Sequence, residues 1–128
     1  MEKIKSYKDL QVWQRGVELS VKIYKLTENF PKSEQYGLTN QMRRASVSIP
    51  SNIAEGFGRS KTEFVRYIQI ARGSLAELET QVEIAKRINY FDETTYNNLL
   101  SDTAILAKQL NVLSQRLSSR PSPPTTSN

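Results

Sequence analysis

The chain has 128 residues, which is enough for one domain with a single hydrophobic core and too few for two. It contains no cysteine and no histidine, which excludes disulfides, thiolate nucleophiles, imidazole general bases and nearly every zinc or haem site. An enzyme built from this sequence would have to work with Asp, Glu, Lys, Tyr or Ser alone. We therefore expect a protein that is not an enzyme, with no catalytic residue, no metal and no cofactor.

Neither end of the chain carries a signal for export or membrane insertion. Residues 1–10 lack the apolar core of a signal peptide, and no run approaches the ~20 apolar residues of a membrane span. Residues 118–128 are rich in Pro, Ser and Thr and cannot bury enough apolar surface to offset their ordering entropy. We expect a cytoplasmic protein without membrane contact, in which residues 1–117 form the domain and residues 118–128 a disordered tail.

The first predicted helix covers residues 6–29 and has two apolar stripes on nearly opposite faces. It starts at Ser6, where a hydroxyl N-cap is followed three residues later by Asp9, and it ends before Pro31. The first stripe consists of Leu10, Trp13, Val17, Val21 and Tyr24. The second stripe consists of Val12, Leu19, Ile23, Leu26 and Phe30. The small residues Gly16, Ser20 and Thr27 fill the gap between them.

Apolar and small residues together cover about 220° of this helix, whereas one bundle core uses a stripe of roughly 100°. Long neighbouring side chains or the tail can cover the excess, or other copies of the chain can pack on it. We favour the second explanation. The predicted oligomer interface consists of Val12, Leu19, Ile23 and Leu26.

The second predicted helix runs from about Ser33 to the glycines at positions 56 and 58, which suit a helix C-terminus. Its core stripe is Leu38, Met42, Ala45 and Ile49. Pro50 either kinks this helix or begins a fresh one, because proline lacks the N–H that a helix interior needs and is common at a first helical position. Ser51 and Asn52 are expected to satisfy backbone groups that Pro50 leaves without partners.

The third and fourth predicted helices carry heptad seams. The third starts at Ser60, which forms a capping box with Glu63, and reaches about Ile88; the fourth starts at Asp92. The seam of the third is Phe64, Ile68, Ala71, Leu75, Leu78, Val82 and Ala85. The seam of the fourth is Tyr96, Leu99, Thr103, Leu106, Leu110, Leu113 and Leu117. Heptads joined by short connections predict an all-α fold, an antiparallel up-down-up-down four-helix bundle.

The most distinctive stretches of sequence lie in the second predicted helix, at residues 41–45 and 48–56. Shorter stretches accompany them at residues 7–10, 12–13, 58–59 and 71–79. Together they resemble the bacterial four-helix bundle proteins that are also called large-subunit rRNA intervening-sequence proteins. The resemblance covers nearly the whole chain up to residue 117. It implies a bundle that assembles as a ring-like homo-oligomer, with a pentamer favoured, in a family that has no settled biochemical activity.

More distantly, the chain is similar to the accessory proteins of diversity-generating retroelements. That resemblance implies a pentameric barrel that binds nucleic acid and a reverse transcriptase. Both resemblances therefore point to partners: other copies of the chain, RNA or DNA, and a second protein.

Six cations in residues 43–72 are candidates for phosphate contacts, because guanidinium groups match phosphate oxygens and Tyr67 lies among them to stack on a base. They are Arg43, Arg44, Arg59, Lys61, Arg66 and Arg72. Alternatively, several of them pair with Glu55, Glu63, Glu77 or Glu79 between helices or subunits. The leading hypothesis is a non-enzymatic oligomer that associates with nucleic acid, structured RNA favoured, without base-specific readout. The competing hypothesis is a scaffold or adaptor whose surface binds another protein, such as a nucleic-acid enzyme.

Overall fold

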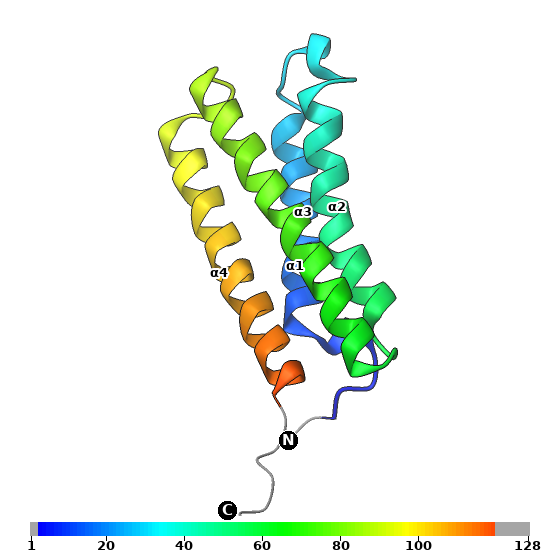
Figure 1. Ribbon diagram of the computed structural model, residues 1–128. Helices are drawn as coiled ribbons and strands as arrows, with labels where there is room; N and C mark the ends of the chain where they lie inside the picture. Colours follow the sequence, from blue (N-terminus) through cyan, green and yellow to red (C-terminus); the bar gives the residue numbers. More distant parts are fainter. Residues whose placement is uncertain (1–2, 120–128) are drawn as a thin grey trace, which may run out of the picture.

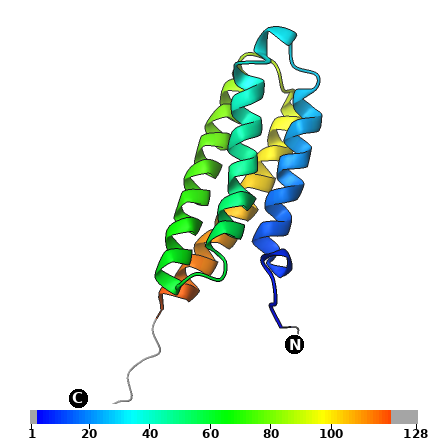
Figure 2. The same ribbon diagram turned by 90° about the vertical axis from the view of Figure 1, so that its right-hand side faces the viewer.

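The computed structural model describes residues 3–119, and the described residues form four helices and no strand (Figure 1). The helices are α1 (Gln11–Thr27), α2 (Leu38–Gly56), α3 (Lys61–Arg87) and α4 (Glu93–Ser118), with two short 3-10 turns, η1 (Tyr7–Asp9) and η2 (Lys32–Glu34). Consecutive helices run in opposite directions and lie side by side in both views (Figure 2). This confirms the predicted all-α bundle, whereas assembly into a ring stays a prediction.

The starts of α3 and α4 are the ones predicted from sequence. The Ser60 hydroxyl accepts a hydrogen bond from the Glu63 amide at 3.2 Å, and the Asp92 carboxylate accepts one from the Thr95 amide at 2.8 Å. Each cap satisfies a backbone donor that has no partner inside the helix. α4 ends at Ser118, one residue beyond the predicted domain boundary, and residues 120–128 of the predicted tail lie outside the described residues.

The first two helices start later than predicted. Ser6 and Asp9 do form a capping box, but it caps η1, and the extended backbone of Leu10 separates this turn from α1. Similarly, Ser33 lies in η2, and α2 begins only at Leu38, whose amide donates to the Glu34 carboxylate at 3.0 Å. The two start positions predicted from sequence therefore fall at the short 3-10 turns, and the helices themselves begin several residues later.

One continuous hydrophobic core fills the bundle. Every predicted seam residue of α3 is buried, from Phe64 to Ala85, and so are Leu99, Thr103, Leu106 and Leu110 of α4. α2 contributes Leu38, Met42, Ala45, Ile49 and Ile53. The core stripes predicted for α2, α3 and α4 are therefore confirmed. Residues spaced alternately by three and four positions lie on one face of a helix, and in each of these helices that face points into the core.

α1 presents the opposite face to the core from the one predicted. Val12, Leu19 and Ile23 are 5%, 4% and 0% exposed within the single chain, and Leu26 is partly buried against the same core. The predicted interface of Val12, Leu19, Ile23 and Leu26 is therefore wrong, since these side chains pack inside one subunit. Of the other stripe, Val21 and Tyr24 are 48% and 43% exposed, whereas Leu10 and Trp13 are partly buried against the core.

Small residues let α1 lie close against α2. Gly16, Ser20 and Thr27 are all buried where the two helices meet. A side chain on Gly16 would meet Pro50 at 3.3 Å, and the Ser46 hydroxyl donates to the Ser20 hydroxyl at 3.2 Å. The small residues and the stripe of Val12, Leu19 and Ile23 are neighbours on α1 and together form its buried face.

α2 continues through Pro50 as one helix, which excludes a fresh helix start at that position. Asn52 donates from Nδ2 to the Ser48 carbonyl at 2.8 Å, whereas the carbonyl that Pro50 leaves without its helical donor is that of Ser46, so this bond is not the predicted one. Ser51 instead is exposed and lies on the outer surface that α1 and α2 share.

Candidate nucleic-acid interface

Three of the six predicted cations gather at the end of the bundle where α2 turns into α3. The guanidinium carbons of Arg59 and Arg66 lie 5.1 Å and 5.3 Å from the centre of the Tyr67 ring. Lys61 begins α3 between them in sequence, and all three cations are exposed. We name Arg59, Lys61, Arg66 and Tyr67 the basic end. It combines positive charge with an aromatic ring, the two elements that single-stranded nucleic acids bind.

Two glutamates partly neutralise the basic end. Arg59 Nη2 lies 3.0 Å from the Glu55 carboxylate, and Arg66 Nε lies 3.8 Å from the Glu63 carboxylate. The hydrogen bond that Arg59 donates to the Glu55 carboxylate raises the pKa of Arg59 above its usual value. Exposed pairs of this kind contribute little free energy, on the order of 0–1 kcal/mol. Both guanidinium groups can therefore exchange their carboxylates for phosphates.

The close turn between α2 and α3 holds the basic end in place. A Cβ atom on Gly56 would lie 2.6 Å from the Cβ of Tyr67, so only glycine lets the end of α2 approach that tyrosine. Gly58 has a φ of +87°, in the left-handed region that glycine adopts without strain. Ser60 then caps α3. The geometry of the basic end thus follows from three neighbouring positions with distinct backbone requirements.

Arg43 is committed to the contact between α1 and α2. Its Nε donates to the Thr27 hydroxyl at 2.9 Å, its Nη2 donates to the Tyr24 carbonyl at 3.2 Å, and its guanidinium carbon lies 4.6 Å from the centre of the Tyr24 ring. These contacts satisfy carbonyl and hydroxyl groups at the C-terminal end of α1. Arg43 is therefore a structural residue rather than a phosphate contact.

The remaining two predicted cations lie on other surfaces. Arg72 reaches across to α4, where its Nε donates to the Asn111 side chain at 3.1 Å. Arg44 is exposed and lines a cleft between α2 and α3 together with Glu77. The six cations thus do not form one surface. Glu55 and Glu63 do pair with Arg59 and Arg66, but each pair joins exposed side chains three or four residues apart in the sequence rather than two helices or subunits, as was predicted.

Sequence patterns missed Tyr36, the most exposed large apolar or aromatic side chain among the described residues at 88%. It lies between η2 and α2 and lines the same cleft as Arg44. The sequence did contain a signal for this surface residue, namely an aromatic side chain in an otherwise polar connection. Large aromatic side chains are seldom left fully exposed to solvent without a function.

Among the described residues there is neither a metal-binding cluster nor a helix that could span a membrane. Within residues 3–119, no three acidic side chains come together in a way that could hold a metal ion. None of the helices in that part of the chain is long and apolar enough to cross a membrane.

The family model described as 23S rRNA-intervening sequence protein matches residues 8–112. The chain belongs to this family. The match extends from η1 to the middle of α4 and so includes the whole basic end. No curated protein matches the chain.

A solved structure from Bacteroides thetaiotaomicron has the same fold as this intervening-sequence protein. It is described as a protein with unknown function from the S23 ribosomal protein family. The two share 24% identity and superpose with a TM-score of 0.75, over 81% of this chain and 95% of the other. At this identity the likeness shows the fold alone.

Proposed function

We propose that this intervening-sequence protein is a non-enzymatic, oligomeric bundle that associates with nucleic acid, structured RNA favoured, through its basic end. The observation that carries the proposal is the exposed group of Arg59, Lys61 and Arg66 at one end of the bundle, with the guanidinium groups of Arg59 and Arg66 held over the half-buried Tyr67 ring. Guanidinium groups bind phosphates through paired N–H donors, and an unpaired base can stack on their planes. The family description, which places these proteins with ribosomal RNA inserts by name, agrees with an RNA ligand.

Self-association would multiply the weak charge of one basic end. Each chain has a formal charge of +5, so a ring-like homopentamer would carry five times that, or +25. Several basic ends held in one particle bind a single RNA with far higher avidity than one end does. Counterion release from the RNA then drives binding without readout of base sequence.

The surface available for self-association is the outward stripe of α1 together with the neighbouring face of α2. Trp13, Val17, Val21 and Val47 line a shallow groove of about 310 Å³ there, and most of its lining is apolar. Large exposed apolar surfaces typically mark contacts with other proteins. This surface replaces the interface predicted from sequence on the other side of α1.

A scaffold or adaptor function is the second candidate. It is favoured by the engagement of Arg43 and Arg72 within the chain, which leaves fewer cations for RNA than the sequence offers. In that function the exposed face of α1 and α2 would bind a different protein, such as a nucleic-acid enzyme, and the positive charge would only speed the encounter.

The test is a salt-titrated gel shift with structured RNA and duplex DNA. We expect the double variant Arg59→Ala, Arg66→Ala to weaken RNA binding and to reduce the slope of log K against log salt by about 2, or about 1 for each cation removed. The matched control is Lys86→Ala, Arg87→Ala. It removes the same charge at the opposite end of α3, where Lys86 likewise lies over a tyrosine ring and Arg87 likewise pairs with a glutamate.

Equal losses in the two double variants would mean that total charge, and not the basic end, governs binding. No RNA binding at low salt by the unaltered protein would overturn the proposal and leave the adaptor function.

A further inference from the structure

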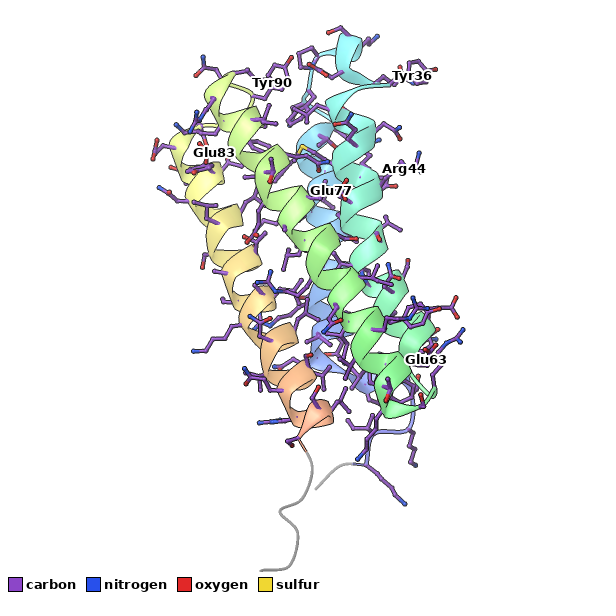
Figure 3. All side chains as sticks on the ribbon, viewed as in Figure 1. Tyr36, Arg44, Glu63, Glu77, Glu83 and Tyr90 are labelled. Atoms are coloured by element: carbon purple, nitrogen blue, oxygen red, sulfur yellow. The ribbon has the colours of Figure 1, made fainter. Side chains whose placement is uncertain are left out.

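A polar cleft of about 650 Å³ lies between α2 and α3, away from the basic end. Its lining includes Tyr36, Asn40, Arg44, Glu77 and Gln81. Figure 3 shows Tyr36 in the connection before α2, Arg44 in the N-terminal half of α2 and Glu77 on the adjacent α3, whereas Glu63 marks the other end of these helices. The volume is within the range of small-ligand sites, about 300–1,000 Å³.

Gln81 gives the cleft a polar group in need of a partner. Its side chain is only 7% exposed, and among the described residues its Oε1 finds no hydrogen-bond donor. A buried acceptor without a donor is unfavourable, so a ligand or water that donates there is stabilised. The terminal torsion of glutamine is soft, which lets the amide turn its oxygen toward the cleft.

Arg44 and Glu77 face the cleft from opposite sides and are both exposed. At the other end of these helices Arg59 and Arg66 have carboxylate partners, but within residues 3–119 no ion pair involves Arg44 or Glu77. The cleft thus offers a ligand one group that donates hydrogen bonds and one that accepts them, without a net charge from the pair.

Tyr36 supplies a flat apolar surface at the entrance. With 88% of its surface in water, the ring contributes almost nothing to the core of the bundle. An aromatic ring of this kind binds an unstacked nucleobase well, because every base has a π-face.

We propose that this cleft binds an unpaired guanine of RNA. The Tyr36 ring stacks on the base, the Glu77 carboxylate accepts hydrogen bonds from N1–H and from the N2 amino group, and Arg44 donates to the adjoining phosphate. Guanine is the only common base with two adjacent donors on its Watson–Crick edge, which matches the two oxygens of a carboxylate. Gln81 adds a further acceptor beneath Glu77, one helical turn away on α3. The proposal rests on the RNA association proposed above and adds a base-specific contact to it.

Fluorescence anisotropy with labelled single-stranded RNAs tests the proposal. The probes are a short oligonucleotide with one guanosine and the same oligonucleotide with inosine at that position, which lacks only the N2 amino group. We expect the guanosine RNA to bind about tenfold more tightly, since a bidentate base contact discriminates by about that factor. In Glu77→Gln the two RNAs bind equally. Tyr36→Ala weakens the guanosine RNA by about tenfold.

Glu79→Gln is the matched control, because it removes the same charge two positions further along α3 and does not line the cleft. It should leave the guanosine preference unchanged. Guanosine monophosphate as competitor should displace the RNA only at much higher concentration than unlabelled RNA does. Displacement by the free nucleotide at the same concentration as RNA would instead assign the cleft to a nucleotide and overturn the RNA assignment.

The outcome separates this proposal from the function of the basic end. Variants of Arg59 and Arg66 should weaken both RNAs by the same factor and leave their ratio intact. Equal binding of guanosine and inosine RNA by the unaltered protein overturns the guanine site while leaving the RNA association intact. No binding of either RNA overturns both.

Discussion

Two glycines of this bundle, Gly56 and Gly73, differ in the space that an added side chain would find. At Gly56 the end of α2 meets α3 so closely that an added Cβ would lie 2.6 Å from the Cβ of Tyr67 and 3.1 Å from the Phe64 ring. The Tyr67 Cβ is attached directly to the backbone of α3 and cannot move aside on its own. At Gly73, in the exposed middle of α3, an added Cβ would meet nothing within 4 Å.

We therefore expect Gly56→Ala to lower the free energy of unfolding by about 1–3 kcal/mol, as overpacking does elsewhere. Gly73→Ala should raise it by about 1 kcal/mol, because alanine is the better helix former and the site has room. Urea denaturation followed by circular dichroism measures both. A tolerated Gly56→Ala would contradict the close approach of α2 to Tyr67 of α3.

At the level of single residues, the sequence identified the cations and the carboxylate partners of Arg59 and Arg66, but not the contacts that Arg43 and Arg72 make with other helices. Arg43 and Arg44 are adjacent in the sequence and of the same residue type, yet the first is held by the end of α1 and the second faces a cleft. Their directions differ because neighbouring positions on a helix point about 100° apart. What each direction encounters depends on the packing of the other helices.

Between elements, Glu34 links the two connections at one end of the bundle. Its carboxylate accepts hydrogen bonds from the Leu38 amide at the start of α2 and, at 2.8 Å, from the Tyr90 hydroxyl in the loop between α3 and α4. The bond from the Leu38 amide, followed by that from Tyr90, lowers the pKa of Glu34 below its ordinary 4.5. The same contact raises the pKa of Tyr90.

A carboxyl group with a lowered pKa stabilises the fold only while it is ionised. The contribution of Glu34 is therefore fully present above pH 4.5 and is lost as the pH falls through the lower pKa of the folded state. We expect Glu34→Gln to be less stable than the unaltered protein in urea at pH 7 and equally stable in strong acid. Tyr90→Phe removes one of the two bonds and should show a smaller gap with the same pH dependence. A gap that is constant from pH 7 to pH 2 would contradict this account.

The helices themselves differ in how far sequence defines them. For α3 and α4 the seam, the caps and the start positions were all predictable, because heptad spacing and N-cap residues agree. For α1 two apolar stripes compete, and spacing alone cannot choose between them. The choice depends on how α1 packs against the other helices: Gly16 and Ser20 lie against Pro50 and Ser46 of α2, and Val12, Leu19 and Ile23 enter the core.

For the whole molecule, the question is what covers the outward face of α1 and α2. Val21 is 48% exposed and Val47 40% exposed, and both line the same groove. We expect the double variant Val21→Glu, Val47→Glu to dissociate the oligomer while leaving helicity intact. A carboxylate on this face stays hydrated in a single chain, but burying it in a contact between subunits is unfavourable. Light scattering and circular dichroism measure the two quantities.

The control for that experiment is Ile84→Glu, Ile88→Glu. Both isoleucines belong to the C-terminal end of α3 and are 45% exposed, so the change in exposed apolar surface is similar. This variant should keep the mass of the unaltered protein. A single-chain mass for the unaltered protein itself would count against oligomerisation through any face.

Sequence alone determined that the chain forms four antiparallel helices, where α3 and α4 begin and which of their faces turn inward. These properties are local, since they depend on capping groups and on spacings within one helix. The inward face of α1, the division of the arginines between structural and exposed positions, and the cleft beside Tyr36 were decided only by the tertiary structure. Each of them depends on how closely two helices approach, and that distance is set by pairs of residues far apart in the sequence.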